Sequence, residues 1–488
     1  MKNLPQLIAY VDRLPGGTFR DLAALLDGPL GGLFGGVHVL PFFHPIDGAD
    51  AGFDPIDHTR VDARLGTWND VKALTTRVDV MSDLIVNHVS RRSPQFQDFD
   101  RRGEQSPSAG LFLTYSTVFP DGAREADLTA LYTIRPALPF TPHDTAAGGR
   151  VLLWTTFTRD QIDIDVEHPE GRAYLTAVLA KLHGAGIRMI RLDAVGHAVK
   201  KAGTSCFMIP ETFEFIAGLT AQARALGIEV LVEVHGHYQD QIAVARQVDR
   251  VYDFALPPLV LHALYHRDAA PLKRWLEIRP RNAVTVLDTH DGIGVADVAA
   301  RRGPAPAAGL LPPEDIEAIV ETIHQRSGGG SRLASGAAAS NVDDSQINCT
   351  FYDALGRRDA EYLIARAIQC FTPGIPQIYY VGLLAGGNDL DLLRRTGVGR
   401  DVNRHYYSAA ELDEQLARPV VQSLLALLRF RHTHPAFGGA FRVVRSSAAD
   451  TLALEWTSGA EAARLDVSLT PMRATVTCSG EGIGTWPW

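Results

Sequence analysis

The stretch that decides the fold of this chain is Ile190-Arg191-Leu192-Asp193, which closes an apolar run that begins at Ile187. Such a run predicts a buried strand. Because side chains two residues apart share one face of a strand, Arg191 and Asp193 point one way and Leu192 the other. In a barrel of parallel strands, Leu192 would pack against the outer helices. Arg191 and Asp193 would then face the carboxyl-terminal rim, where such barrels keep their chemistry.

Three other predicted strands end in polar side chains in the same manner. They are the runs 83–86, 230–232 and 284–287, which end in Asn87-His88, in Glu233-Val234-His235 and in Asp288-Thr289-His290-Asp291. If all four strands belong to one barrel, their ends meet at the same rim. The sequence therefore predicts one site built from four strand ends.

Further apolar runs, separated by helical patterns, complete the barrel. They lie at 7–11, 37–42, 251–254 and 375–381, and helical stripes such as Leu175, Val178, Leu179 and Leu182 fall between runs. Eight strands with intervening helices predict an α/β fold, a (β/α)8 TIM barrel.

Two loop-rich insertions interrupt the barrel, after strands 3 and 7, and a small all-β domain follows it. The second insertion contains the glycine- and serine-rich stretches 327–331 and 335–340, which predict a mobile loop near the site. After Pro435, polar and apolar residues alternate, which predicts short antiparallel strands in a small β-sandwich. We expect barrel segments at 1–88, 169–291 and 359–434, insertion subdomains at 89–168 and 292–358, and the C-terminal β domain at 435–488.

The composition excludes several classes of protein. The 488 residues carry 47 basic and 56 acidic side chains, a net charge of −9, without a basic run. This balance argues against nucleic acid and against anionic membrane surfaces as partners. No apolar run is long enough to span a membrane, and the N-terminus lacks an apolar signal segment. The four cysteines are far apart, so we expect a reduced, cytoplasmic protein.

Asp193, Glu233 and Asp291 are the candidate catalytic groups, since each ends a strand beside an arginine or histidine. Acids at such positions can also cap the following helix. Carboxylates held together suit glycosyl chemistry, in which one attacks the anomeric carbon, one protonates the leaving oxygen and one stabilises the cationic transition state. Arg191 would keep Asp193 ionised.

A metal site is the weaker interpretation of the same rim. His88, His235 and His290 lie on different strands and share no HxxxH spacing, so we expect no metal. His88 and His290 could instead donate hydrogen bonds to sugar hydroxyls, although either could be structural. The sequence has no nucleotide-type phosphate loop, and we expect no cofactor.

These strand ends resemble the signature regions of the α-amylase superfamily. The matching segments are 83–88, 190–193, 233–235 and 287–291, and 161–165 resembles a fifth region. Within the superfamily, the segments 49–58, 203–208, 248–257 and 399–407 resemble the sucrose phosphorylases most closely. The resemblance runs from residue 2 to about residue 434 and weakens in the C-terminal domain.

The resemblance implies a role for each candidate residue. Asp193 would be the nucleophile that forms a β-glucosyl-enzyme, Glu233 the general acid/base and Asp291 the transition-state stabiliser. The residues implied to bind the glucosyl ring are Asp50, Phe53, His88, Arg191, His290 and Arg400, with Phe157 and Gln161 beside it. On the acceptor side, Tyr132, Arg135, Asp343 and Gln346 would lie on two loops that alternately hold fructose and phosphate.

Arg135 is the physically sensible phosphate ligand, because a guanidinium pairs with phosphate through two hydrogen bonds. Ser345 departs from the tyrosine expected in sucrose phosphorylases, which puts the acceptor specificity in question.

The resemblance thus implies a retaining transfer of glucose from sucrose to inorganic phosphate, with α-D-glucose 1-phosphate and D-fructose as products. Related phosphorylases acting on sucrose 6-phosphate, glucosylglycerol or glucosylglycerate are the alternative. A hydrolase, an isomerase and a non-catalytic binding subunit are further alternatives, and the last would be expected to have lost part of the acid set. We expect only small-molecule partners, with self-association into a homodimer left open.

Overall fold

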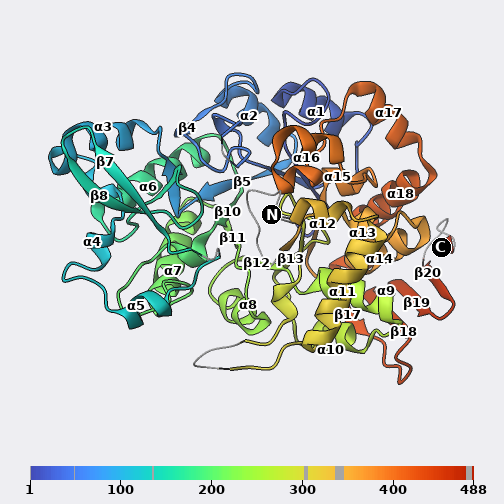
Figure 1. Cartoon of the computed structure of the whole chain (residues 1–488). Coiled ribbons are helices and arrows are strands. Elements are labelled where there is room, and N and C mark those ends of the chain that lie inside the picture. Colours follow the sequence, from blue (N-terminus) through green and yellow to red (C-terminus); the bar gives the residue numbers. More distant parts are fainter. Residues whose placement is uncertain are drawn as a thin grey trace.

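A closed barrel of eight parallel strands forms the centre of the protein (Figure 1). The computed structural model describes residues 2–48, 50–134, 137–301, 306–335, 346–479 and 486–487. The strands follow one another around the barrel in the order β1 (Gln6–Ala9), β16 (Ile375–Tyr379), β13 (Ala283–Thr285), β12 (Arg250–Asp253), β11 (Glu229–Val232), β10 (Met189–Asp193), β5 (Asp79–Ile85) and β2 (Gly36–Val39). The predicted (β/α)8 barrel is confirmed.

The register of β10 positions the deciding stretch. Arg191 pairs with Asp83 of β5 on one side and with Leu231 of β11 on the other. Every residue of β10 is buried, and Leu192 is completely so. The alternation of faces along the strand therefore sends Arg191 and Asp193 together to one side of the sheet, as the period of two predicts.

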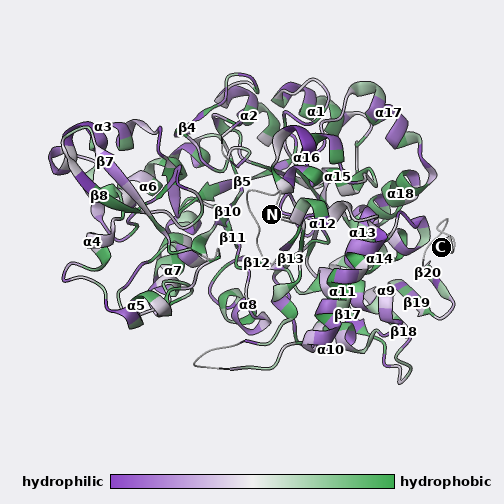
Figure 2. Cartoon of the chain, viewed as in Figure 1, coloured by the Kyte–Doolittle hydropathy of each residue, from purple (hydrophilic) through white to green (hydrophobic). Residues whose placement is uncertain are grey.

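Helices surround the barrel where the sequence places apolar stripes. They include α1 (Phe19–Asp27), α2 (Trp68–Thr75), α6 (Pro169–Gly184), α7 (Pro210–Ala225), α8 (Tyr238–Ala245), α9 (Leu256–His266), α10 (Ala270–Ile278), α13 (Phe351–Ala354), α14 (Asp359–Phe371), α15 (Tyr380–Leu383), α16 (Leu390–Thr396), α17 (Ala409–Ala417) and α18 (Pro419–Thr433). Helix α6 begins with a proline at its first position and buries the predicted stripe from Leu175 to Leu182. Figure 2 shows green, apolar residues interspersed with purple, hydrophilic residues along several of these helices.

The first insertion stands to one side of the barrel, at the left of Figure 1. It contains α3 (Pro94–Arg102), α4 (Tyr115–Val118), α5 (Glu125–Ala130) and a hairpin of β7 (Phe140–Thr145) and β8 (Gly149–Trp154). A small core of its own gathers around Trp154 and Phe119. Pairing of β9 (Gln161–Asp163) with β6 (His88–Ser90) ties this insertion to the end of the third barrel strand. A second short ladder nearby joins β3 (Phe43–His44) and β4 (Asp57–Val61).

The second insertion is more regular than predicted. It contains β14 (Ile293–Gly294), α11 (Pro313–Arg326), α12 (Gly330–Ser335) and β15 (Gln346–Ile347). We expected the stretch 327–331 in a mobile loop, but residues 327–329 form a tight turn between two helices and residues 330–331 begin α12. Gly328 and Gly329 adopt φ angles of +61° and +81°, which only glycine adopts readily, and Ser331 is fully buried. The other predicted loop stretch lies almost wholly outside the described residues.

The C-terminal strands form one antiparallel sheet and not the β-sandwich we expected. Its order is β17 (Ala440–Val443), β18 (Thr451–Ser458), β19 (Glu461–Leu469), β20 (Met472–Cys478) and β21 (Trp486–Pro487). The buried face packs on the barrel's own helices, where the Trp456 indole donates a hydrogen bond of 2.7 Å to the Phe371 carbonyl of α14. Alternation in sequence predicts one buried face, but it does not say whether helices or a second sheet cover that face.

None of the helices in the described ranges combines the length and apolar character that crossing a bilayer requires.

Candidate active site

A cavity of about 620 Å³ lies at the carboxyl-terminal ends of the barrel strands and brings most of the predicted site residues together. Those that line it are Asp50, Phe53, His88, Tyr132, Phe157, Gln161, Asp193, Glu233, His290, Asp291, Gln346 and Arg400. Arg191 lies buried beneath the three acids. Arg135, Asp343 and Ser345 lie outside the described residues.

Arg191 holds two of the three candidate acids, Asp193 and Glu233, together with Asp83. Its Nη1 donates hydrogen bonds to Asp193 Oδ1 at 2.8 Å and to Asp83 Oδ1 at 2.5 Å, and its Nη2 pairs with Glu233 Oε1 at 2.5 Å. The guanidinium is 2% exposed, so these contacts are made away from water. One cation thus fixes the positions of three carboxylates contributed by β5, β10 and the end of β11.

A strained residue aids this arrangement. Ala194, directly after Asp193, adopts a left-handed conformation with φ of +53°. This conformation directs its backbone N–H towards Glu233 Oε2, which accepts the hydrogen bond at 3.2 Å. Strain of this kind is typical of sites where position matters more than stability.

The shared guanidinium does not by itself keep Asp193 ionised, contrary to our expectation. Burial is the largest influence and raises the pKa of Asp193, and the neighbouring carboxylates of Glu233, Asp83 and Asp291 raise it further. Arg191 lowers it, but its charge is divided among three acids. The pKa of Asp193 therefore lies well above its ordinary value, and Arg191 is the group that favours its ionised form.

Asp291 has the opposite environment. Burial opposes its ionisation, but Arg400 at 3.0 Å, His290 and Arg404 lower its pKa far below the ordinary value. Asp291 is consequently a permanent anion at the rim. A fixed negative charge is what a developing cation requires.

The inner end of the cavity is suited to a sugar ring. Phe53 stacks on His290 with ring centroids 4.7 Å apart and an angle of 7°. His88 Nε2 donates a hydrogen bond of 2.8 Å to the Phe53 carbonyl, and burial lowers the pKa of both His88 and His290, so both are neutral. Asp50 accepts hydrogen bonds from Arg400 and Arg404. The end is therefore polar, rigid and closed by aromatic faces.

The outer end of the cavity carries more exposed groups. Tyr132 is 45% exposed and stacks on Phe207 at 4.4 Å. Phe157 makes edge contacts with His88 and His197. His197, Phe207 and Arg159 also line this end, and the sequence analysis did not select them as site residues. They belong to irregular loops whose spatial neighbours no local pattern reveals.

His235 is the most informative residue that the sequence analysis left out. Its Nδ1 lies 3.4 Å from Asp297 Oδ2 and its Nε2 lies 3.9 Å from Glu233 Oε1, and its ring stacks on Phe254 at 3.9 Å. Burial alone would lower its pKa, but the carboxylates of Asp297, Glu233 and Asp291 raise it to about 9. His235 is therefore a cation at neutral pH. Its position at a strand end was a sequence signal that could have identified it as a site residue. No sequence signal indicated its pairing with Asp297.

Within the described part of the chain, one group of side chains is spaced to share a metal ion, and it does not line this cavity. It contains His262 and His266, an HxxxH pair that the sequence analysis overlooked.

Comparison with known proteins adds an independent line of evidence. The α-amylase catalytic domain family matches residues 33–247. A sucrose phosphorylase of Agrobacterium vitis is 58% identical over 98% of this chain and 98% of its own length, and one of Bifidobacterium adolescentis is 50% identical over 97% and 93%. The crystal structure of a sucrose 6F-phosphate phosphorylase from Thermoanaerobacter thermosaccharolyticum superposes with a TM-score of 0.91 at 38% identity, covering 100% of this chain and 98% of that one.

Proposed function

Because this chain belongs to the sucrose phosphorylase family, within the α-amylase superfamily, we propose that it transfers the glucosyl group of sucrose to phosphate. The products are α-D-glucose 1-phosphate and D-fructose. The observation that carries this function is the identity of 58% over 98% of both chains. The alternatives, sucrose 6-phosphate, glucosylglycerol and glucosylglycerate, are named for relatives of lower identity and are not favoured.

The first half of the reaction breaks the bond between glucose and fructose. The Asp193 carboxylate attacks the anomeric carbon, while Glu233 gives its proton to the fructosyl oxygen. This step requires Asp193 to be ionised, which Arg191 favours, and Glu233 to carry a proton. The result is a β-glucosyl-enzyme and free fructose.

The second half returns the enzyme to its starting state. Phosphate attacks the anomeric carbon from the side that fructose left, and Glu233 accepts a proton if the attacking oxygen carries one. Two inversions give net retention, so the product has the α configuration. In both steps Asp291, held as an anion by Arg400 and His290, stabilises the positive charge on the sugar.

Phosphate needs cations on the acceptor side of the cavity. We assign this role to Arg135, with protonated His235 as a second positive group close to Glu233. Arg159 also lines this end. Ser345 can donate one hydrogen bond in place of the expected tyrosine.

The function is tested by incubating the enzyme with phosphate and each of the four donors in turn. Sucrose should give glucose 1-phosphate at the highest kcat/KM, and Asp193→Asn should lose nearly all turnover while keeping its fold. Faster turnover of sucrose 6-phosphate, glucosylglycerol or glucosylglycerate would mean that sucrose is not the preferred substrate. Free glucose as the main product would mean that the enzyme is a hydrolase and not a phosphorylase.

We further propose the cytoplasm as the location of this enzyme, since Cys206, Cys349 and Cys370 are free thiols in the structure, as they would be in a reducing compartment. A homodimer remains a prediction that light scattering of the purified protein would test.

A further inference from the structure

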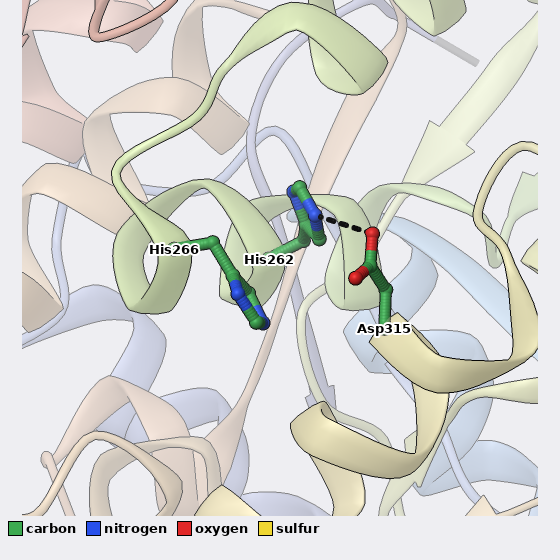
Figure 3. A group of neighbouring side chains, drawn as sticks. All are labelled: His262, His266 and Asp315. Carbon is green, nitrogen blue, oxygen red and sulfur yellow. Dashed lines mark hydrogen bonds and ion pairs between the residues drawn. The ribbon is translucent and has the colours of Figure 1, made fainter.

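His262 and His266 lie one turn apart on α9 and face Asp315 in the first turn of α11 (Figure 3). Residues four apart share one face of a helix, which explains how the two rings come together. Their centroids lie 4.7 Å apart at 23°. The ligand atoms of all three residues lie within 4.8 Å of one another.

The hydrogen bonds of His262 leave one nitrogen in an unusual position. Its Nδ1 lies 3.3 Å from the Asp268 carbonyl oxygen and its Nε2 lies 3.2 Å from Asp315 Oδ2. Both neighbouring atoms are acceptors, and a neutral ring has one hydrogen to donate. When Nδ1–H donates to the carbonyl, Nε2 and Asp315 Oδ2 are left as two ligand atoms that one cation can bind together.

The geometry points to a divalent zinc ion as that cation, and we propose that His262, His266 and Asp315 bind it. Two imidazole nitrogens and one carboxylate oxygen are ligands that zinc takes, and a water molecule can complete four-coordination. The Asp268 carbonyl fixes the ring of His262 with Nε2 towards the ion, as groups behind metal ligands commonly do. His262 is 3% exposed, whereas His266 is exposed and gives the ion access from solvent.

The position of this site indicates a structural role. Helix α9 follows barrel strand β12, and α11 belongs to the second insertion, which ends in β15 and Gln346 of the active site. An ion bound to both helices would fasten the insertion to the barrel wall. Because none of the three residues lines the cavity, the ion takes no part in glucosyl transfer.

The test is titration of the full-length enzyme, without a histidine tag, with zinc chloride in a calorimeter. We expect one zinc ion per chain, and His266→Ala should weaken binding by at least about tenfold, since losing an outer partner alone costs that much. Asp315→Asn should weaken it similarly. The matched control is His183→Ala, which removes an exposed histidine from α6 and should leave binding unchanged.

Two further measurements make the result decisive. Cobalt(II) in place of zinc should give visible absorption bands of a four-coordinate ion in the wild type and in His183→Ala, and not in His266→Ala. Zinc should raise the melting temperature of the same two proteins only. Absence of stoichiometric binding to the wild type, or equal affinity of His266→Ala and His183→Ala, would overturn the proposal. The His266 side chain is exposed, so its removal is not expected to unfold the protein.

Discussion

Arg191 is the single residue on which the arrangement of the site depends most. It connects Asp83, Asp193 and Glu233, and their charges leave the cluster with an excess of negative charge. Burial and the neighbouring carboxylates raise the pKa of Asp193, whereas Arg191 lowers it. The same guanidinium therefore orients both of the acids that we propose as nucleophile and general acid.

Replacement of the general acid should separate two kinds of donor. Glu233→Gln keeps the shape of the side chain but has no proton to give, so fructose release from sucrose should fall by roughly 10²–10⁴. Glucosyl fluoride has a better leaving group and should still load Asp193. The measurement is pre-steady-state release of fructose and of fluoride. An equal loss with both donors would mean that Glu233 is not the acid.

Asp297 should control the charge of His235. It is fully buried, with Oδ2 3.4 Å from His235 Nδ1, and it is the main influence that raises the His235 pKa to about 9 against the effect of burial. In Asp297→Asn the pKa of His235 should fall, so that its ring loses its charge at a lower pH. The increase of the KM for phosphate with pH should therefore begin at a lower pH than in the wild type. Glu233 and Asp291, which also face the ring, remain in the variant.

The raised pKa of His235 also makes the stability of the folded protein depend on pH. A histidine whose pKa is raised on folding stabilises the protein below its ordinary value of 6.5, and this stabilisation disappears as pH rises through about 9. The wild type should lose this part of its stability between those values, and Asp297→Asn should not. The control is Asp240→Asn, a partly exposed carboxylate nearby that pairs with Arg301. Identical pH profiles of wild type and Asp297→Asn would contradict the assignment.

At the scale of elements, the acceptor loop should separate phosphorolysis from hydrolysis. Arg135→Ala should raise the KM for phosphate by about tenfold or more, because charge-assisted hydrogen bonds contribute roughly 1.5–3 kcal/mol each. Free glucose should rise as a share of product across a phosphate titration. Arg150→Ala, an exposed arginine in the β7–β8 hairpin of the same insertion, is the control. If the product ratio of Arg135→Ala equals that of the control, phosphate is held by other groups.

A buried ion pair between the end of β12 and the end of α10 should dominate local stability. Asp253 at the end of β12 accepts hydrogen bonds from Trp275 Nε1 at 2.8 Å and Arg279 Nε at 2.6 Å. Asp253→Ala leaves the buried Arg279 charge without its carboxylate, which should cost about 3–5 kcal/mol. Asp253→Ala should begin to unfold at a temperature several degrees lower than the wild type. Asp391→Ala, which breaks an exposed pair with Arg394, is the control and should change little. Equal melting temperatures of the two variants would refute this role.

The elements also show what the sequence could and could not predict. Strand ends such as Arg191 and Asp193 were predictable, because a period of two and a shared rim are local rules. The partners Asp83, Asp297 and Arg404 were not, because they meet the acids only after the barrel closes. For the same reason, we predicted a second sheet over the buried face of the C-terminal sheet, where the structure has helices. His262 and His266 show a different failure, since their spacing was visible and was overlooked.

At the scale of the whole molecule, the fold divides the reaction between its parts. The barrel supplies the acids and the end of the cavity that is rigid and closed by aromatic faces, including Phe53 and His290. The insertions supply Tyr132 and Gln346, which line the same cavity and which we propose to act on the acceptor side. In this proposal the donor end remains fixed while the acceptor end receives first fructose and then phosphate.

Glucosyl transfer through Asp193 is tested most directly by the mass of Glu233→Gln after incubation with α-glucosyl fluoride in the absence of phosphate. The protein should gain one glucosyl residue, and this residue should be found on the peptide that contains Asp193. Added phosphate should then remove the label as α-D-glucose 1-phosphate. A label on another residue, no covalent label at all, or release as free glucose despite phosphate would contradict the transfer through Asp193 to phosphate.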